Sequence, residues 1–226
     1  MKLVIFNGSP RYKKSNSKIL IEQFLIGYTR FCSETVPIHY LAKRNRKKEE
    51  KELFQNADTI LVIFPLYTDS MPGIVKEFFE NVIDTDIKTP KKIGFIVQSG
   101  FPEAIHSIYV ERYLEKFAKR IKSDYLGTII KGGVEGIQIM PKSMTKKLFR
   151  SFEILGEHFA KNEAFSPEIN EILRKPFKMS PARIFLFKQL SKTGLTNFYW
   201  NSNLKKNNAF RNRFDKPFSK ENFSTQ

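Results

Sequence analysis

Cysteine is nearly absent from this chain of 226 residues, because Cys32 is the only one. A single thiol excludes an internal disulfide, a four-cysteine zinc site and a cysteine-bound iron–sulfur cluster within one chain. Long hydrophobic runs are also missing: no apolar stretch approaches the roughly 20 residues of a membrane helix, and residues 1–9 do not resemble a signal peptide. We therefore expect a soluble, cytoplasmic protein with no membrane span.

Negative charge is scarce as well, because 39 Lys and Arg residues stand against 23 Asp and Glu residues, a net charge of +16. The excess is densest in residues 166–226, where 12 basic side chains face 4 acidic ones. Such a balance favours an anionic partner of one of three classes: nucleic acid, an anionic membrane surface or a ligand that carries phosphate. Charge alone does not choose among these three classes.

Five short runs rich in β-branched and aromatic residues alternate with stretches of helical spacing. Continuous apolar runs of this kind are typical of strands that are buried on both faces. Neighbouring parallel strands need a helix between them, so the alternation predicts an α/β protein with three layers, a five-stranded parallel sheet with helices on both faces. The predicted strands are residues 2–6, 36–41, 59–65, 92–98 and 125–131.

Pro37 refines the predicted sheet. Proline has no N–H to donate within a sheet, so the second strand should lie at an edge, as it does in the strand order 2-1-3-4-5. The charged run of residues 43–54 follows this strand, and we interpret it as the solvent-exposed face of a helix in preference to a binding patch.

The composition changes after Phe165, where prolines interrupt a segment rich in Asn, Lys and Phe. Its aromatic residues, with Trp200 among them, are unusual for a disordered tail. The sequence therefore predicts a domain of residues 1–165 and a basic, aromatic-rich C-terminal extension, residues 166–226, that packs on the body or on a second subunit.

Ligands of an open parallel sheet bind at the carboxyl ends of the strands, near the point where the strand order reverses. The loop after the first strand, residues 7–17, offers hydroxyl and amide donors and leads into a helix N-terminus, which favours a phosphate. The phosphate motifs GxxxxGK[ST] and GxGxxG are absent. The alternative is a plain helix cap at Asn16 or Ser17, with Arg11 in solvent.

The loops after the third and fourth strands have a different character. Tyr67, Leu66 and Met71 offer an apolar wall for a flat ring, and the glycine turn of residues 98–104 brings Phe101 beside it. Together the three loops occupy the places where a sheet of this order binds a flavin.

The segments GSPR and SNS of the first loop, PLYTDSMPG with IVKEFFENV of the third and SGF of the fourth resemble the NAD(P)H-dependent FMN reductase and quinone reductase family of flavodoxin-like proteins. The resemblance covers about residues 1–160. It implies a flavodoxin-like fold, bound FMN, and NADH or NADPH as co-substrate. It assigns the FMN phosphate to Ser9, Arg11, Asn16 and Ser17, one side of the isoalloxazine to Pro65, Leu66, Tyr67, Thr68 and Met71, and the other side to Ser99, Gly100 and Phe101.

The resemblance implies an enzyme that passes hydride from NAD(P)H through FMN to a small acceptor such as a quinone, a flavin or a nitroaromatic compound. We expect a homodimer, no metal and no catalytic side chain, because the flavin supplies the chemistry. The histidines share no metal-ligand spacing, although His106 lies close enough to the fourth loop to contact nicotinamide.

Two other classes of function stay open. One is an electron-carrying flavodoxin without its own NAD(P)H turnover, against which the charge of +16 counts, because such carriers are typically acidic on the flavin side. The other is a basic protein of nucleic acid or membrane surfaces. No nucleic-acid motif accompanies the charge, so we interpret the aromatic and basic residues 197–214 as a packing surface and do not expect a nucleic-acid partner.

Overall fold

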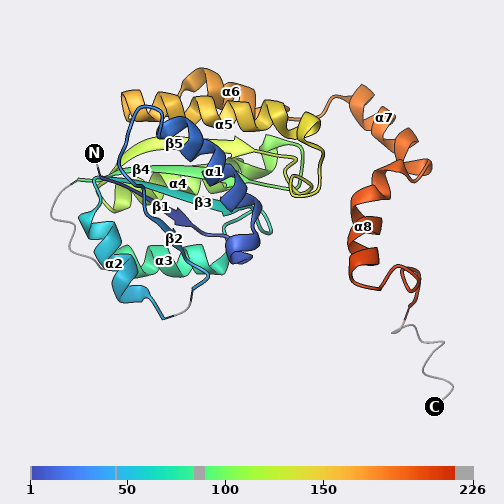
Figure 1. The fold of residues 1–226 in the computed structure, drawn as a ribbon, viewed down its shortest axis with the longest axis horizontal. Helices are drawn as coiled ribbons and strands as arrows, with labels where there is room; N and C mark the ends of the chain where they lie inside the picture. Colours follow the sequence, from blue (N-terminus) through green and yellow to red (C-terminus); the bar gives the residue numbers. More distant parts are fainter. Residues whose placement is uncertain (1, 44, 84–89, 217–226) are drawn as a thin grey trace, which may run out of the picture. The chain divides into compact units, whose positions relative to one another are not determined.

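The computed structural model of the chain describes residues 2–43, 45–83 and 90–216. Within them, five strands form one sheet in the order β2-β1-β3-β4-β5, and every pairing is parallel (Figure 1). The predicted α/β class and strand order are confirmed. The strands are β1 (Leu3–Asn7), β2 (Ile38–Tyr40), β3 (Thr59–Pro65), β4 (Lys92–Gln98) and β5 (Asp124–Lys131).

The strand at the sheet's edge is shorter than predicted. β2 holds three residues in place of the expected six, because Pro37 lies just before it and has no N–H to donate. The Pro37 carbonyl still accepts a hydrogen bond from the Ile5 N–H at 3.0 Å. β1 and β3 are buried along their whole length, because helices cover both faces of the sheet.

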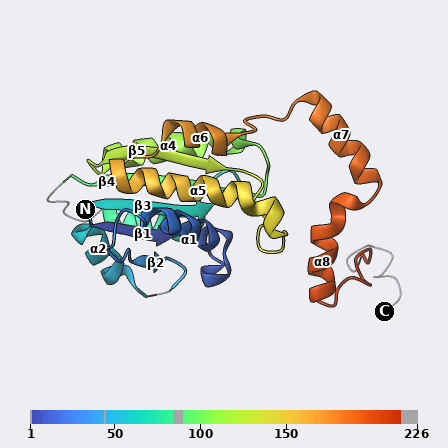
Figure 2. The ribbon, with the colours of Figure 1, turned by 45° about the horizontal axis from the view of Figure 1, so that its top comes forward.

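Helices cover both faces of the sheet (Figures 1 and 2). One face packs against α2, α3 and α4, and the other against α1, α5 and α6. The α-helices are α1 (Asn16–Tyr28), α2 (Lys47–Asn56), α3 (Gly73–Ile83), α4 (Ile108–Arg120), α5 (Lys142–Asn162), α6 (Pro167–Arg174), α7 (Pro181–Lys192) and α8 (Phe198–Lys206). Three short 3₁₀ turns, η1 (Tyr12–Lys14), η2 (Ala104–Ser107) and η3 (Leu195–Asn197), complete the described elements.

α1 and α5 approach each other closely through two glycines. A Cβ atom built on Gly27 would lie 1.8 Å from the Glu153 carbonyl oxygen, and one on Gly156 would lie 1.9 Å from the Phe24 carbonyl oxygen. No side chain fits at either position. The glycine pair therefore brings the two helix backbones together and fixes α1, whose first turn belongs to the candidate site.

The chain forms two compact units, Met1–Lys178 and Met179–Gln226. The first extends beyond the boundary expected at residue 165, because α6 buries Ile169 and Leu173 in the core against β5. Ser166 caps α6 by accepting a hydrogen bond from the Ile169 N–H at 3.2 Å. The second unit contains α7 and α8, and its packing on the body or on a second subunit stays a prediction.

No helix among the described residues is both long enough and apolar enough to span a membrane.

Candidate functional site

The loops that follow β1, β3 and β4 meet at the carboxyl edge of the sheet and enclose a cavity of about 60 Å³. Small-molecule pockets usually hold roughly 300–1,000 Å³. Only one end of a larger ligand would enter this cavity, and the rest would lie against the surrounding loops. The cavity is lined by Ser9, Arg11, Asn16, Pro65, Leu66, Tyr67, Gln98, Ser99, Gly100 and Glu135.

The loop after β1 is held by its own polar side chains. The Asn7 amide accepts from the Ser9 N–H at 3.0 Å and donates to the Ser15 hydroxyl at 3.3 Å. That hydroxyl is the cap of α1, because it accepts from the Lys18 N–H at 3.2 Å. Neither residue named in the alternative of a plain helix cap is therefore the cap, and among the described residues the N–H groups of Asn16 and Ser17 have no hydrogen-bond partner.

The side chains of the first turn of α1 differ in their partners. The Asn16 amide donates to the Val134 carbonyl at 2.8 Å and accepts from Gln138 at 2.9 Å, so it ties the turn to the loop after β5. The Ser17 hydroxyl is fully buried and has no hydrogen-bond partner in the described structure. A buried hydroxyl without a partner is unfavourable. Together with two N–H groups at the positive end of α1, it fits a phosphate ligand.

Arg11 and Glu135 form an ion pair at the cavity, with 3.1 Å between the guanidinium and the carboxylate. About half of the Arg11 side chain is exposed, so the pair contributes little stability. Arg11 therefore faces the region that the sequence assigns to phosphate, but in this structure it binds a carboxylate there. A phosphate at the same place would compete with Glu135 for the guanidinium.

The loop after β3 makes a tight turn. The Tyr67 N–H donates to the Ser70 carbonyl at 2.8 Å, and the reverse bond is 3.0 Å. Thr68 and Asp69, at the tip, have positive φ angles of 49° and 57°, a conformation that is uncommon without glycine. The turn leaves 42% of Tyr67 exposed beside the cavity, which suits contact with a flat ring.

The loop after β4 is fastened to the loop after β5. The Gly133 N–H donates to the Phe101 carbonyl at 2.8 Å, and the Ser99 hydroxyl donates to the same carbonyl at 2.9 Å. Phe101 is more than half exposed, and its ring centroid lies 4.8 Å from that of His106. The His106 imidazole also lies 3.6 Å from the Glu103 carboxylate. The exposed Phe101 and the half-buried His106 therefore form an aromatic pair after β4.

The structure brings most of the predicted site residues together around one cavity. Four of them do not line it. Ser17 is buried in the first turn of α1, Thr68 lies at the exposed tip of its turn, Met71 packs against the core, and Phe101 lies on the exposed surface of its loop. Their roles, like those of the lining residues, stay predictions.

Sequence reasoning missed two lining residues, Gln98 and Glu135. Gln98 ends β4, and Glu135 belongs to the GGVEG segment that follows β5. A signal was present for both, since each lies at the carboxyl end of a predicted strand, where ligands of this sheet bind. No cluster of three or more metal-ligating side chains exists among the described residues.

A family model described as "Flavodoxin-like fold" matches residues 1–150. A search of curated proteins finds no significant match. Solved structures of similar fold include an NADPH-quinone reductase from P. pentosaceus, which is 20% identical, covers 72% of this chain and 99% of its own, and has a TM-score of 0.55.

Two further solved structures are similar in fold. An FMN-dependent NADH-azoreductase from Bacillus anthracis, in complex with FMN, is 16% identical over 70% of this chain and 98% of its own, with a TM-score of 0.55. An NAD(P)H:quinone oxidoreductase from Methanothermobacter marburgensis is 17% identical over 70% of this chain and 96% of its own, with a TM-score of 0.56. At such low identity these likenesses establish the fold alone.

Proposed function

Because the chain belongs to the flavodoxin-like family, we propose that it is an FMN-dependent oxidoreductase that takes hydride from NADH or NADPH and reduces a small acceptor such as a quinone, a flavin or a nitroaromatic compound. One observation carries the proposal: the first turn of α1, which holds the buried Ser17 hydroxyl without a partner, and the exposed Tyr67 belong to loops that meet at one cavity. The names of the similar structures, which include FMN-dependent and NAD(P)H-dependent reductases, support it.

The residues present fit the parts of FMN. The first turn of α1, with its two N–H groups and the Ser17 hydroxyl, would hold the phosphate. Tyr67 and Phe101 would border the isoalloxazine, and the backbone groups of residues 99–100 would contact its polar edge. Bound FMN would supply the hydride chemistry, so the protein needs to bind the flavin, orient it and leave one ring face open.

The charge of the chain favours an enzyme over an electron carrier. A net charge of +16 attracts anionic co-substrates such as NADH and NADPH, because long-range attraction raises their rate of encounter. We also propose that the protein works as a homodimer, in which a second subunit helps to cover the exposed rings of Tyr67 and Phe101.

The test is to incubate the purified protein with FMN and with riboflavin, and then to record the visible spectrum and the melting temperature. We expect FMN to raise the melting temperature more than riboflavin does, because only FMN has the phosphate that α1 would bind. Oxidation of NADH or NADPH with an added quinone then separates enzyme from carrier. A protein that stays colourless and is stabilised by neither flavin would contradict the proposal.

A further inference from the structure

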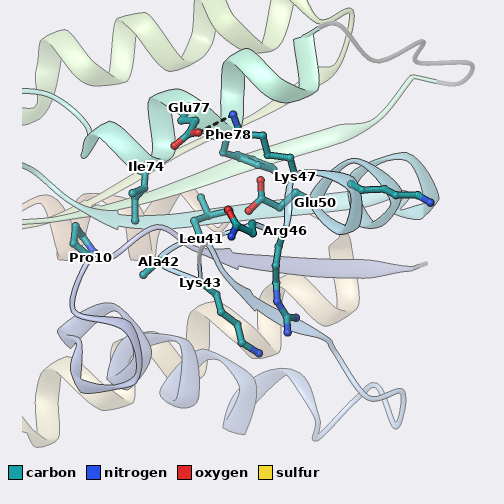
Figure 3. Close-up of a pocket in the computed structure, with 12 residues that line it drawn as sticks. Pro10, Leu41, Ala42, Lys43, Arg46, Lys47, Glu50, Ile74, Glu77 and Phe78 are labelled. Carbon is teal, nitrogen blue, oxygen red and sulfur yellow. Dashed lines mark ion pairs between the residues drawn. The ribbon is translucent and has the colours of Figure 1, made fainter.

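A second and larger cavity, of about 770 Å³, lies beside the loop after β1 (Figure 3). It is bounded by the residues that follow β2, by the N-terminus of α2 and by α3. Its volume falls within the rough range of 300–1,000 Å³ that is typical of small-molecule sites. Pro10 lines this cavity, whereas its neighbours Ser9 and Arg11 line the smaller one, so the two cavities share a loop.

Apolar side chains and one buried carboxylate face this cavity. Ile74 is half-buried and lies with the edge of the buried Leu41 at the cavity, which gives a small apolar surface for a flat base, whereas Phe78 behind them is fully buried in the core. Glu50 is only 7% exposed, and its carboxylate lies 3.6 Å from His39 Nε2, which is too long for a hydrogen bond. This carboxylate therefore keeps the capacity to accept hydrogen bonds from ligand hydroxyls.

The charges around the cavity favour an anion. Four cationic side chains and two carboxylates line it, a net charge of +2. The ammonium of Lys47 already binds Glu77 at 2.8 Å, as the dashed line in Figure 3 shows, and Arg46 binds Glu49 at 2.7 Å. Lys43 is exposed and has no ion-pair partner among the described residues.

The helix that begins at this cavity adds donors. α2 starts at Lys47, and the side chain of its cap residue, Arg46, binds the Glu49 carboxylate and does not cap the backbone N–H groups of the first turn. The N–H groups of that turn and the positive end of the helix dipole are therefore open to an anion. The helix also turns Glu50 and Phe54 to its buried side, which the charged run of the sequence did not reveal.

We propose that this cavity binds a nucleoside phosphate. The base would lie on Ile74 and Leu41, the ribose hydroxyls would donate to Glu50, and the phosphate would bind Lys43 and the first turn of α2. The ligand has two possible sources, a free nucleotide or the adenosine-phosphate part of the nicotinamide co-substrate. The proposal goes beyond the proposed function, because it requires no flavin in the neighbouring cavity.

The test is calorimetric titration of the full chain with ADP, in the absence and in the presence of FMN. We expect a dissociation constant below about 1 mM in both conditions. Lys43→Ala should weaken ADP binding roughly tenfold and leave the binding of adenosine unchanged, because only ADP has phosphates for that side chain. Lys43 is exposed, so this variant keeps its fold, and Lys116→Ala on the exposed side of α4 is the matched control.

A second pair of titrations tests the ribose contact. Glu50→Gln should weaken the binding of ADP but not that of 2′,3′-dideoxy-ADP, which lacks the hydroxyls, whereas Glu52→Gln on the same helix should change neither. Circular dichroism melting checks that each variant is folded. The proposal is overturned if ADP produces no binding heat, or if ADP binds and neither Lys43→Ala nor Glu50→Gln changes its affinity.

Competition identifies the source of the ligand. If NADH or NADPH displaces ADP from the flavin-free protein, the cavity holds the adenosine-phosphate part of the co-substrate. If neither does so, the ligand is a free nucleotide. A protein that binds FMN but not ADP would overturn this proposal alone, and one that binds ADP but not FMN would overturn only the proposed function.

Discussion

The buried hydroxyl of Ser17 gives opposite expectations for the free and the flavin-bound protein. It lacks a hydrogen-bond partner, so Ser17→Ala should leave the stability of the flavin-free protein unchanged or raise it. The same change should weaken FMN binding roughly tenfold, because a donor to the phosphate is lost. Unfolding curves and FMN titrations measure the two effects. If Ser17→Ala binds FMN as tightly as the original chain, Ser17 does not hold the phosphate.

Glu135 places a negative charge where the phosphate is expected. Glu135→Gln should tighten FMN binding by roughly two- to fivefold, because it removes a like charge and releases the Arg11 guanidinium from its ion pair. Riboflavin binding should not change, and the gain for FMN should shrink at high salt. Weaker FMN binding in this variant would place the phosphate away from Glu135.

Lys131, the last residue of β5, makes the stability of the folded chain depend on pH. Burial lowers its pKa below the usual value, so the unfolded chain binds more protons than the folded one between the two pKa values. The free energy of unfolding therefore rises as the pH increases through that window. Lys131→Met should abolish this part of the rise, which melting temperatures from pH 7 to pH 10 will show. Lys116→Met, at an exposed position, should keep it.

At the residue scale, the sequence predicted which loops form the site better than which atoms face it. Ser9, Tyr67 and Ser99 line one cavity, because each follows a strand whose end is fixed by the sheet, and their role in binding stays a prediction. The cap of α1 was not predicted, because Ser15, Asn16 and Ser17 are all suitable cap residues and the choice depends on the distant contact between Asn16 and Val134.

At the scale of elements, the contact between α1 and α5 is the most sensitive to substitution. Gly156→Ala places a methyl group against the Phe24 carbonyl and should lower the free energy of unfolding by about 1–3 kcal/mol or more. Gly73→Ala in α3 is the control: no atom lies within 4 Å of the added Cβ, so the change should stay within about 0.5 kcal/mol. Denaturant unfolding compares them, and equal stabilities would mean that α5 shifts at little cost.

The strands were easier to predict than the helix contacts. β3 and β4 begin and end at the predicted residues, because their apolar runs are bounded by polar residues or proline. The close approach at Gly27 and Gly156 was not predicted, since an isolated glycine within a helical pattern does not say which backbone it meets. The division at Lys178 has a related origin, because α6 is short and its place against β5 depends on tertiary contacts.

At the scale of the whole molecule, the second unit supplies a prediction. Within this unit Phe185, Phe187 and Trp200 are more than half exposed, an apolar surface that favours burial against the body or a second subunit. Removal of residues 179–226 should therefore lower the melting temperature or the oligomeric state, as calorimetry and light scattering would measure. If both are unchanged, and a protease removes the segment rapidly from the intact protein, the second unit is a tether.

The glycine contact between α1 and α5 also affects how the chain folds as it leaves the ribosome. α1 ends at Tyr28, but the helix that covers it is complete only at Asn162, so about 134 further residues must be translated first. At about 5–20 residues per second, this takes roughly 7 to 27 s. During that interval the apolar side of α1, including Phe24, lacks its final partner, and it is open to a chaperone that binds nascent chains.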